Sequence, residues 1–146
     1  MAPDDLSPRA AFLGQFQPEL VPFFLQFCEK ISSLSSDVVM FTARKAVCLF
    51  DAARELGLLK TQGQVTSDRV LDMDLEWLRD KSVTIVDDVL ITGSSLHRAI
   101  SVLREAGCAH IDVLALAVDS DYWLPDLVTP TAPYLQLDNR RALMLC

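Results

Sequence analysis

Two mostly apolar runs joined by a helical pattern constrain the fold of this chain more than any other feature. The runs cover residues 83–89 and 111–118, and between them residues 94–106 place apolar side chains at helical spacing before Gly107. Apolar runs of this length are typical of strands that are buried on both faces of a sheet. Because a helix separates the two strands, we expect them to lie parallel in one sheet.

The same alternation of strand and helix extends toward the N-terminus. Residues 37–42 form a short apolar run rich in β-branched side chains, and a helical period follows from Ala43 or Arg44 up to Gly57. Residues 64–71 alternate imperfectly and indicate a further strand. Alternating strands and helices of this kind predict an α/β fold, with a doubly wound, mainly parallel sheet and helices on both faces.

The ends of the chain carry weaker patterns. A helix over residues 18–34 is expected to open the fold, beginning at Pro18 and Glu19, and residues 134–137 indicate a short last strand. The length of 146 residues suits a single domain that covers residues 1–146. The segment 120–146 is poorly defined, and its apolar last residues predict either a truncated chain or a partner that covers this end.

The composition excludes several classes of protein. Apolar residues make up 51% of the chain, the net charge is -7, and Lys and Arg form no basic run. General nucleic-acid binding needs clustered cations, so we expect none. We also expect no membrane contact, because no apolar stretch approaches the roughly 20 residues of a spanning helix. The N-terminus lacks the pattern of a signal peptide and the four cysteines are scattered, which predicts a cytoplasmic protein with reduced thiols.

The segment that follows Val83 carries the residues with the most specific chemistry. The strand is expected to end on two adjacent carboxylates, Asp87 and Asp88, which suit the paired hydroxyls of a sugar. Shortly afterwards Thr92 to Ser95 open a helix around Gly93, where backbone amides and the helix dipole favour an anion. Carboxylates for a diol, followed by an anion-binding turn, predict a site for ribose 5-phosphate.

A purely structural explanation exists for each half of this segment. Asp87 and Asp88 would simply end a strand, and Ser94 and Ser95 would simply cap a helix. Either half alone favours that explanation, but the two halves at this spacing favour a binding site.

The whole segment closely resembles the phosphoribosyl-pyrophosphate motif of type I phosphoribosyltransferases. That family pattern has four mostly apolar residues, two acids, two apolar residues, a variable one and then Thr-Gly-x-Ser/Thr. The resemblance implies that Asp87 and Asp88 are the catalytic residues and hold the ribose hydroxyls, and that Mg²⁺ is carried by the pyrophosphate and the ribose, with no metal ligands assigned on the protein. It also implies a phosphoribosyl-binding segment that comprises these residues: Asp87, Asp88, Val89, Leu90, Ile91, Thr92, Gly93, Ser94 and Ser95.

A second candidate segment follows the strand at residues 37–42. In the family, the loop after this strand contacts pyrophosphate, which implies that role for Ala43, Arg44 and Lys45. Two cations suit a highly charged anion, whereas at a helix N-terminus they oppose the dipole. The alternative is that Arg44 and Lys45 face solvent on the first helical turn.

The sequence departs from the family pattern in three places. Family enzymes usually close a flexible loop over the site, but here only residues 72–82 separate the second and third predicted strands, and part of that segment looks helical around Asp74. Ser67, Asp68 and Arg69 are the candidates to take over the role of that loop. Ile91 stands where enzymes that take hypoxanthine or guanine have an acid, which argues against that subclass, and Thr84 stands where an aliphatic residue is usual.

Several aromatic residues have both a structural and a functional interpretation. Phe23, Phe24 and Phe27 are expected in the core, with a partner-binding face as the lesser alternative. Trp77 is expected to pack, whereas Trp123 is as well suited to stacking on a base as to packing.

The resemblance predicts an enzyme that transfers a 5-phosphoribosyl group to a nitrogenous base with release of pyrophosphate. The alternative is a binding module that senses a phosphoribosyl compound or nucleotide and acts through a protein partner. A third option is a relic with an empty pocket. The expected ligand is a small phosphoribosyl compound, and a homodimer or a partner protein remains open.

Overall fold

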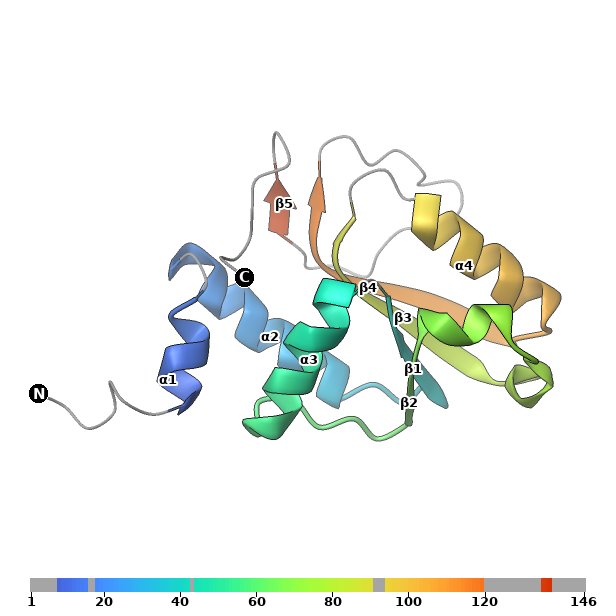
Figure 1. Cartoon of the computed structure of the whole chain (residues 1–146), viewed down its shortest axis with the longest axis horizontal. Coiled ribbons are helices and arrows are strands. Elements are labelled where there is room, and N and C mark those ends of the chain that lie inside the picture. Colours follow the sequence, from blue (N-terminus) through green and yellow to red (C-terminus); the bar gives the residue numbers. More distant parts are fainter. Residues whose placement is uncertain (1–7, 16–17, 43, 91–93, 120–134, 138–146) are drawn as a thin grey trace, which may run out of the picture.

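A computed structural model describes residues 8–15, 18–42, 44–90, 94–119 and 135–137 of the chain. It contains one five-stranded sheet in the order β2-β1-β3-β4-β5, and every pair of neighbouring strands is parallel (Figure 1). This arrangement confirms the predicted doubly wound α/β fold. The strands are β1 (Val38–Phe41), β2 (Gln64–Ser67), β3 (Ser82–Leu90), β4 (His110–Asp119) and β5 (Leu135–Leu137).

Helices precede the sheet and connect its strands. α1 (Pro8–Leu13), η2 (Pro18–Leu20) and α2 (Val21–Ser32) come before β1, α3 (Arg44–Glu55) joins β1 to β2, and α4 (Ser94–Glu105) joins β3 to β4. Both predicted glycine stops are confirmed, because Gly57 and Gly107 have positive φ angles of 75° and 88° just after α3 and α4.

Two sequence-based boundaries were wrong. The helix expected over residues 18–34 does begin at Pro18, as a 3-10 turn that leads into α2, but it ends at Ser32. The sequence did not predict α1, whose Phe12 packs against Phe24 with ring centroids 5.8 Å apart. The strand expected over residues 64–71 stops at Ser67, since Asp68–Asp72 forms the 3-10 helix η3 and buries Leu71.

The sheet separates two apolar clusters. Alternate side chains of β1 point to opposite faces, with Val39 and Phe41 on one and Val38 and Met40 on the other. The first face is covered by α1, α2 and α3, and the opposite face by α4 with η3 and η4 (Glu76–Leu78) (Figure 1). Burial on both sides explains why the strand sequences are continuously apolar.

The aromatic predictions divide by helix face. Phe24 and Phe27 are buried as expected, but Phe23 is 36% exposed, so the prediction of a core position was wrong for that residue. Trp77 packs against the second cluster as predicted, and Trp123 lies outside the described residues.

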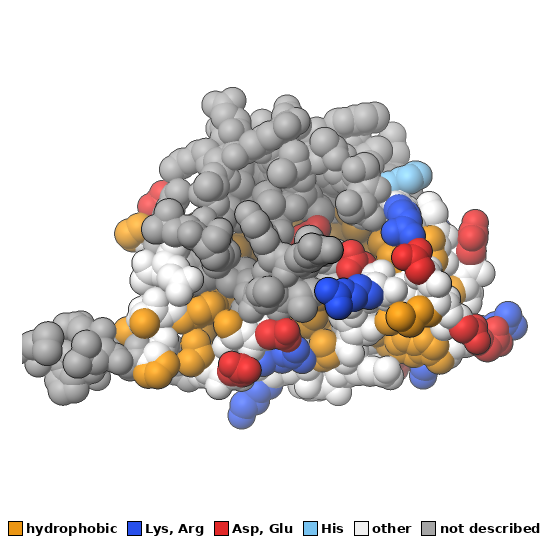
Figure 2. Space-filling model, viewed as in Figure 1, with side chains coloured by type: hydrophobic (Ala, Val, Ile, Leu, Met, Phe, Trp, Pro, Cys, Tyr) orange, Lys and Arg blue, Asp and Glu red, His pale blue; other side chains and the backbone are white. Residues whose placement is uncertain are grey.

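Apart from Asp87, the charged side chains that the structure describes lie at or near the surface and are mixed in sign. On the face seen in Figure 2, Lys and Arg of the described residues alternate with Asp and Glu. Three ion pairs join exposed or half-exposed groups: Arg54 with Asp51, Arg79 with Glu76, and Arg98 with Asp72. No helix in the described part of the chain is both long and apolar enough to cross a membrane.

The amino end of the sheet is closed by a small polar cluster of Ser36, Asp37, Ser82 and Thr84, which we call the amino-end cluster. The Asp37 carboxylate accepts hydrogen bonds from the Ser82 amide at 3.0 Å and from its hydroxyl at 3.2 Å. The hydroxyls of Ser36 and Thr84 bond to each other, which accounts for a threonine in this buried strand position.

Gly63 fits tightly beside this cluster. A Cβ atom at Gly63 would lie 2.4 Å from the Ser36 carbonyl oxygen and 2.9 Å from that of Asp37. Because both atoms belong to the backbone, no side-chain movement could make room, and the approach of β2 to β1 requires glycine at this position.

Candidate functional site

The order of the strands identifies where a ligand site is expected. β1 and β3 are neighbours, yet the helices that follow them pack on opposite faces, since Phe50 of α3 belongs to the first cluster and Leu96 of α4 to the second. In open parallel sheets, ligands bind beyond the carboxyl ends of such a pair, where the two connections diverge (Figure 1). One segment singled out in the sequence follows β1, and the other begins within β3 and continues to the start of α4.

Thr42 joins the two segments at this point. Its amide donates a hydrogen bond to the Val86 carbonyl oxygen at 3.0 Å, and its hydroxyl donates to the same oxygen at 3.4 Å. The side chain is only 4% exposed. The segment with the predicted pyrophosphate-binding residues therefore begins directly beside the residue that precedes Asp87.

Asp87 lies on β3 opposite Ala115 of β4 and is 9% exposed. Alternation along the strand places it on the same face as Val83 and Ile85, the face that α4 covers. Asp87 is engaged in an interaction within the protein. A carboxylate this deeply buried is costly without polar partners, so its position calls for hydrogen-bond donors nearby.

The expectation that β3 ends on the acid pair was wrong. β3 continues through Val89 to Leu90, because β4 continues beside it and pairs Val89 with Ala117 and Leu90 with Val118. The ladder with β1, by contrast, runs only to Phe41 opposite Val86. Asp87 and Asp88 thus lie inside the strand, in a part that extends beyond β1.

The last two residues of the predicted phosphate cradle begin α4. Ser94 and Ser95 form the beginning of this 12-residue helix, whose first turn contains no acidic residue. Amides at such a helix start point outward and favour an anion. Ile91, Thr92 and Gly93 lie outside the described residues, as do the side chains of Asp88, Val89, Leu90, Ser94 and Ser95.

The predicted pyrophosphate segment is described in part. Arg44 and Lys45 form the first residues of α3, which confirms a strand-to-helix turn here. Ala43 lies outside the described residues, and so do the side chains of Arg44 and Lys45. Which of the two interpretations of these cations is right therefore stays a prediction.

Ser67 is a further polar residue at the same end of the sheet. It is the last residue of β2 and pairs with Phe41, the residue that precedes Thr42. The sequence analysis named Ser67 only as a replacement for a missing loop, and it gave Thr42 no role beyond the end of the expected strand over residues 37–42. The available signal was the same in both cases: a hydroxyl residue directly after apolar or alternating strand positions.

The connection between β2 and β3 is folded onto the sheet. Leu71 of η3 and Leu78 of η4 are buried in the second cluster, and Arg98 of α4 contacts Asp72 at 2.5 Å. The helix expected around Asp74 is only the short 3-10 turn η4, and the Asp74 carboxylate accepts a hydrogen bond from the Glu76 amide at 3.0 Å. Buried apolar side chains therefore attach this connection to the sheet.

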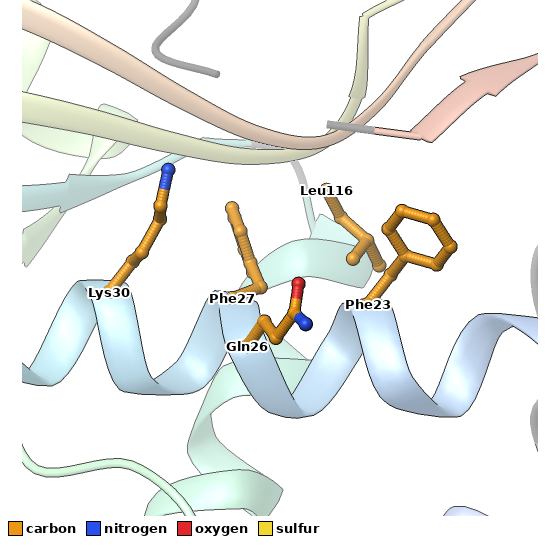
Figure 3. A pocket seen from close by; sticks show the side chains of 5 residues that line it. All are labelled: Phe23, Gln26, Phe27, Lys30 and Leu116. Carbon is orange, nitrogen blue, oxygen red and sulfur yellow. The ribbon is translucent and has the colours of Figure 1, made fainter. Parts of the chain in front are cut away.

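A hollow lies elsewhere on the described part of the protein. Figure 3 shows it between α2 and the sheet, where Phe23, Gln26, Phe27 and Lys30 of α2 and Leu116 of β4 line it. The lining is mainly apolar and contains neither a carboxylate nor a helix start. Such a hollow does not suit a phosphorylated sugar, so the carboxyl end of β1 and β3 is the better candidate.

Comparison with known proteins decides the family. The model of the phosphoribosyl transferase domain matches residues 31–131, a range that includes β1, β3, α4 and both candidate segments. This chain belongs to the phosphoribosyl transferase domain family. The resemblance seen in the sequence is thereby confirmed at the level of the family, and membership supports the prediction of a phosphoribosyltransferase enzyme.

Solved structures of other phosphoribosyltransferases share the fold. A hypoxanthine-guanine-xanthine phosphoribosyltransferase aligns with a TM-score of 0.59 and 17% identity, covering 86% of this chain and 77% of that one. A purine phosphoribosyltransferase from Pyrococcus horikoshii aligns with a TM-score of 0.53 and 20% identity, covering 88% and 92%. A hypoxanthine phosphoribosyltransferase from Staphylococcus aureus gives 0.55 and 12%, covering 82% and 76%.

The sequences have diverged far from those structures. At identities of 20% or less, the alignments establish the fold of this phosphoribosyltransferase and leave its acceptor base undetermined. The comparison with curated proteins found no match.

Proposed function

We propose that this phosphoribosyltransferase binds 5-phosphoribosyl pyrophosphate at the carboxyl end of β1 and β3 and transfers the phosphoribosyl group to a nitrogenous base. In this proposal the carboxylates of Asp87 and Asp88 accept hydrogen bonds from the two ribose hydroxyls. The amides of residues 92–95 bind the 5′-phosphate, and the turn formed by Ala43, Arg44 and Lys45 binds the pyrophosphate.

One observation carries the proposal: the Thr42 amide is bonded to Val86, one residue before Asp87. Two segments chosen for different parts of the same ligand are far apart in the sequence and adjacent in the fold. A chance match of the acid pair and the glycine turn would not require a second anion-binding segment beside it.

The reaction replaces one bond at the anomeric carbon with another. A nitrogen of the base attacks this carbon, the bond from the carbon to the pyrophosphate oxygen breaks, and the pyrophosphate leaves with the bonding electrons. The nitrogen gives up its proton to the departing pyrophosphate or to solvent. Positive charge from Arg44 and Lys45 would offset the negative charge that develops on the leaving group. Asp87 and Asp88 would hold the ribose so that the attacked carbon faces the base.

The residues present fit a Mg²⁺ ion that the substrate carries. Among the described residues, no three His, Cys, Asp or Glu side chains gather into a ligand set. Mg²⁺ is often held by one or two carboxylates together with substrate phosphates, and an acid pair beside a pyrophosphate site suits that arrangement. When bound, the ion would neutralise charge on the pyrophosphate.

We infer that the acceptor is not a 6-oxopurine, although two of the similar structures are named for hypoxanthine. Ile91 stands where the enzymes for those bases have an acid, and isoleucine accepts no proton.

The scattered cysteines further support our proposal of a cytoplasmic location. Burial raises the pKa of Cys28 to about 12 and keeps that thiol unreactive.

Pyrophosphate release tests the proposed reaction. The chain is mixed with phosphoribosyl pyrophosphate, Mg²⁺ and a panel of purine and pyrimidine bases, and release is measured for each base. We expect one base outside the hypoxanthine and guanine group to support release. Release with hypoxanthine or guanine alone would contradict the inference from Ile91.

Calorimetry tests the proposed binding residues. The double variant Asp87→Asn/Asp88→Asn should bind phosphoribosyl pyrophosphate at least tenfold more weakly, because each charge-assisted hydrogen bond contributes about 1.5–3 kcal/mol. Asp112→Asn is the matched control, since Asp112 is an exposed acid of the neighbouring strand near the other end of the sheet. Equal affinity in the double variant and the control would show that the acid pair does not hold the ribose.

The anchored connection between β2 and β3 favours a second candidate function. Leu78 is fully buried, so lifting this connection over the ligand would expose apolar surface. A site without that cover suits a binding module that senses a phosphoribosyl compound and acts through a protein partner or a second copy of the chain. Tight binding of phosphoribosyl pyrophosphate, with no pyrophosphate release for any base, would support sensing.

A further inference from the structure

Only three polar or charged side chains are buried within the described part of the chain: Thr42, Thr84 and Asp87. Thr84 bonds to Ser36 in the amino-end cluster. Thr42 and Asp87 lie together at the carboxyl end, on neighbouring strands. Two of the three costly positions are thus concentrated where the site is proposed.

Thr42 is 4% exposed, and a valine would match the shape of its side chain. A buried hydroxyl costs free energy unless it is hydrogen-bonded, and here it shares the Val86 carbonyl with its own amide. The hydroxyl must therefore contribute something that apolar packing would not.

That contribution is the attachment of the turn. The ladder between β1 and β3 runs to Phe41 opposite Val86, and Thr42 is the last described residue before the turn that leads into α3. With its amide and hydroxyl both bonded to one oxygen, the backbone of Thr42 is restrained against rotation. Since a carbonyl oxygen can accept two hydrogen bonds, both donors are satisfied.

We propose that Thr42 is a positioning residue, which fixes the direction of the pyrophosphate-binding turn relative to Asp87. The inference rests on the proposed function. Thr42 acts through the turn formed by Ala43, Arg44 and Lys45, and its hydroxyl remains bonded to Val86 rather than to the ligand. A turn that is already in place when the ligand arrives binds it more tightly, because less freedom is lost on binding.

Separate measurements on the two halves of the ligand test this assignment. Thr42→Val removes the hydroxyl and keeps the shape, and we expect Mg²⁺-pyrophosphate to bind about fivefold more weakly, the effect of one neutral hydrogen bond. Ribose 5-phosphate should bind within about twofold of wild type, because Asp87 and the start of α4 are untouched. Thr42→Ser keeps the hydroxyl and should restore pyrophosphate affinity.

Thr84→Val is the matched control. It removes the other buried threonine hydroxyl of the sheet, at the amino end, and should lower the melting temperature without changing the affinity for either ligand. In turnover, Thr42→Val should raise the KM for phosphoribosyl pyrophosphate more than it lowers kcat. If Thr42→Val does not fold, Thr42→Ala removes the same hydroxyl without placing a methyl group near the carbonyl.

The outcomes separate this inference from the proposed function. Wild-type affinity for pyrophosphate in Thr42→Val, or an equal loss of both ligands that serine does not rescue, would overturn the positioning role alone. If the wild-type chain does not bind phosphoribosyl pyrophosphate, the proposed function and the positioning role both fall.

Discussion

The two ends of the sheet use the same kinds of residue for different purposes. At the amino end, Asp37, Ser82, Ser36 and Thr84 satisfy one another, and the Asp37 amide also donates to the Ser82 hydroxyl at 2.9 Å. At the carboxyl end, β3 extends past β1, and the connections after Thr42 and Leu90 lead to opposite faces.

The difference between the ends shows what topology adds to residue type. At the amino end the neighbouring strands start at the same level, and the backbone at Gly63 packs closely against residues 36 and 37, so no room is left for a ligand. Neighbouring strands of unequal length with diverging helices leave space for a ligand. We therefore assign stability to the amino end and binding to the carboxyl end, and each prediction below tests that division.

Gly63→Ala should have the largest effect. Its Cβ would overlap the Ser36 carbonyl at 2.4 Å, so the backbone of β2 or of residues 36–37 must move. We expect a loss of on the order of 3 kcal/mol in the free energy of unfolding, the range of strained backbone substitutions. Urea denaturation measures it, and the folded variant should keep its affinity for phosphoribosyl pyrophosphate.

Gly14→Ala is the control for that substitution. There the added Cβ would lie 3.3 Å from the Ala10 carbonyl oxygen, a contact that a small shift relieves. A similar loss in both variants would mean that general glycine effects, and not the tight approach at the amino end, explain the result.

Ligand binding should stabilise the fold from the other end by a comparable amount. At a ligand concentration of 100 times the dissociation constant, linkage predicts about 2.7 kcal/mol of added stability. Asp87→Asn/Asp88→Asn should lose at least about half of this increment at the same concentration, the effect of a tenfold weaker affinity. Its ligand-free stability should stay close to that of wild type, because the relief of a desolvation cost offsets the interaction that Asp87 makes within the protein. Thermal melts with and without phosphoribosyl pyrophosphate measure both quantities. A large drop in ligand-free stability would show that the acid pair stabilises the fold, as the residues at the amino end do.

The sequence was sufficient for the fold and less so for the limits of its elements. Continuous apolar strands and the glycines after α3 and α4 identify a parallel α/β sheet, because two-sided burial leaves a direct mark on sequence. The expected run over residues 83–89 matched β3 to within one residue at each end, and only the expectation that the strand ends on the acid pair was wrong, because β4 continues beside Val89 and Leu90. The alternating pattern likewise predicted a strand as far as residue 71. In the structure residues 68–72 form the 3-10 helix η3 instead, and Leu71 packs in the cluster that α4 covers, a contact that leaves no local signal.

The site shows the same division between local and tertiary information. Asp87, Asp88 and residues 92–95 were recognisable as a motif because they are contiguous. The proposed role of Thr42 could not be recognised from the sequence, because a threonine after a strand is common. That role depends on its bond to Val86, which joins two segments that are distant in the sequence.

Acid should weaken the amino end selectively. Hydrogen bonds from the Ser82 amide, and then from its hydroxyl, lower the pKa of Asp37 below its ordinary value, with a further contribution from Lys81. A carboxyl whose pKa is lower in the folded state adds stability above the unfolded pKa of about 3.9, and that stability is lost as the pH falls through the folded pKa. The stability difference between wild type and Asp37→Asn should therefore be constant near neutral pH and shrink below pH of about 4.

Ser82→Ala sharpens this test because it keeps the carboxylate and the amide bond but removes the hydroxyl bond. As the pH falls, the free energy of unfolding of Ser82→Ala should decrease less than that of wild type. Urea denaturation at intervals from acidic to neutral pH measures both variants, and identical pH profiles for wild type and Ser82→Ala would show that the hydroxyl does not affect Asp37.

Phe23→Ala should have the smallest effect and tests whether binding is confined to the carboxyl end. Phe23 lines the hollow beside α2 and is 36% exposed, so its removal leaves little buried space and should cost about 1 kcal/mol or less. The affinity for phosphoribosyl pyrophosphate should not change, because Lys30 is the only charged side chain that lines the hollow and no carboxylate there could hold the ribose hydroxyls (Figure 3). Calorimetry on this variant decides the matter: a weaker affinity would place part of the ligand against α2 and Leu116, and the carboxyl end could no longer account for binding by itself.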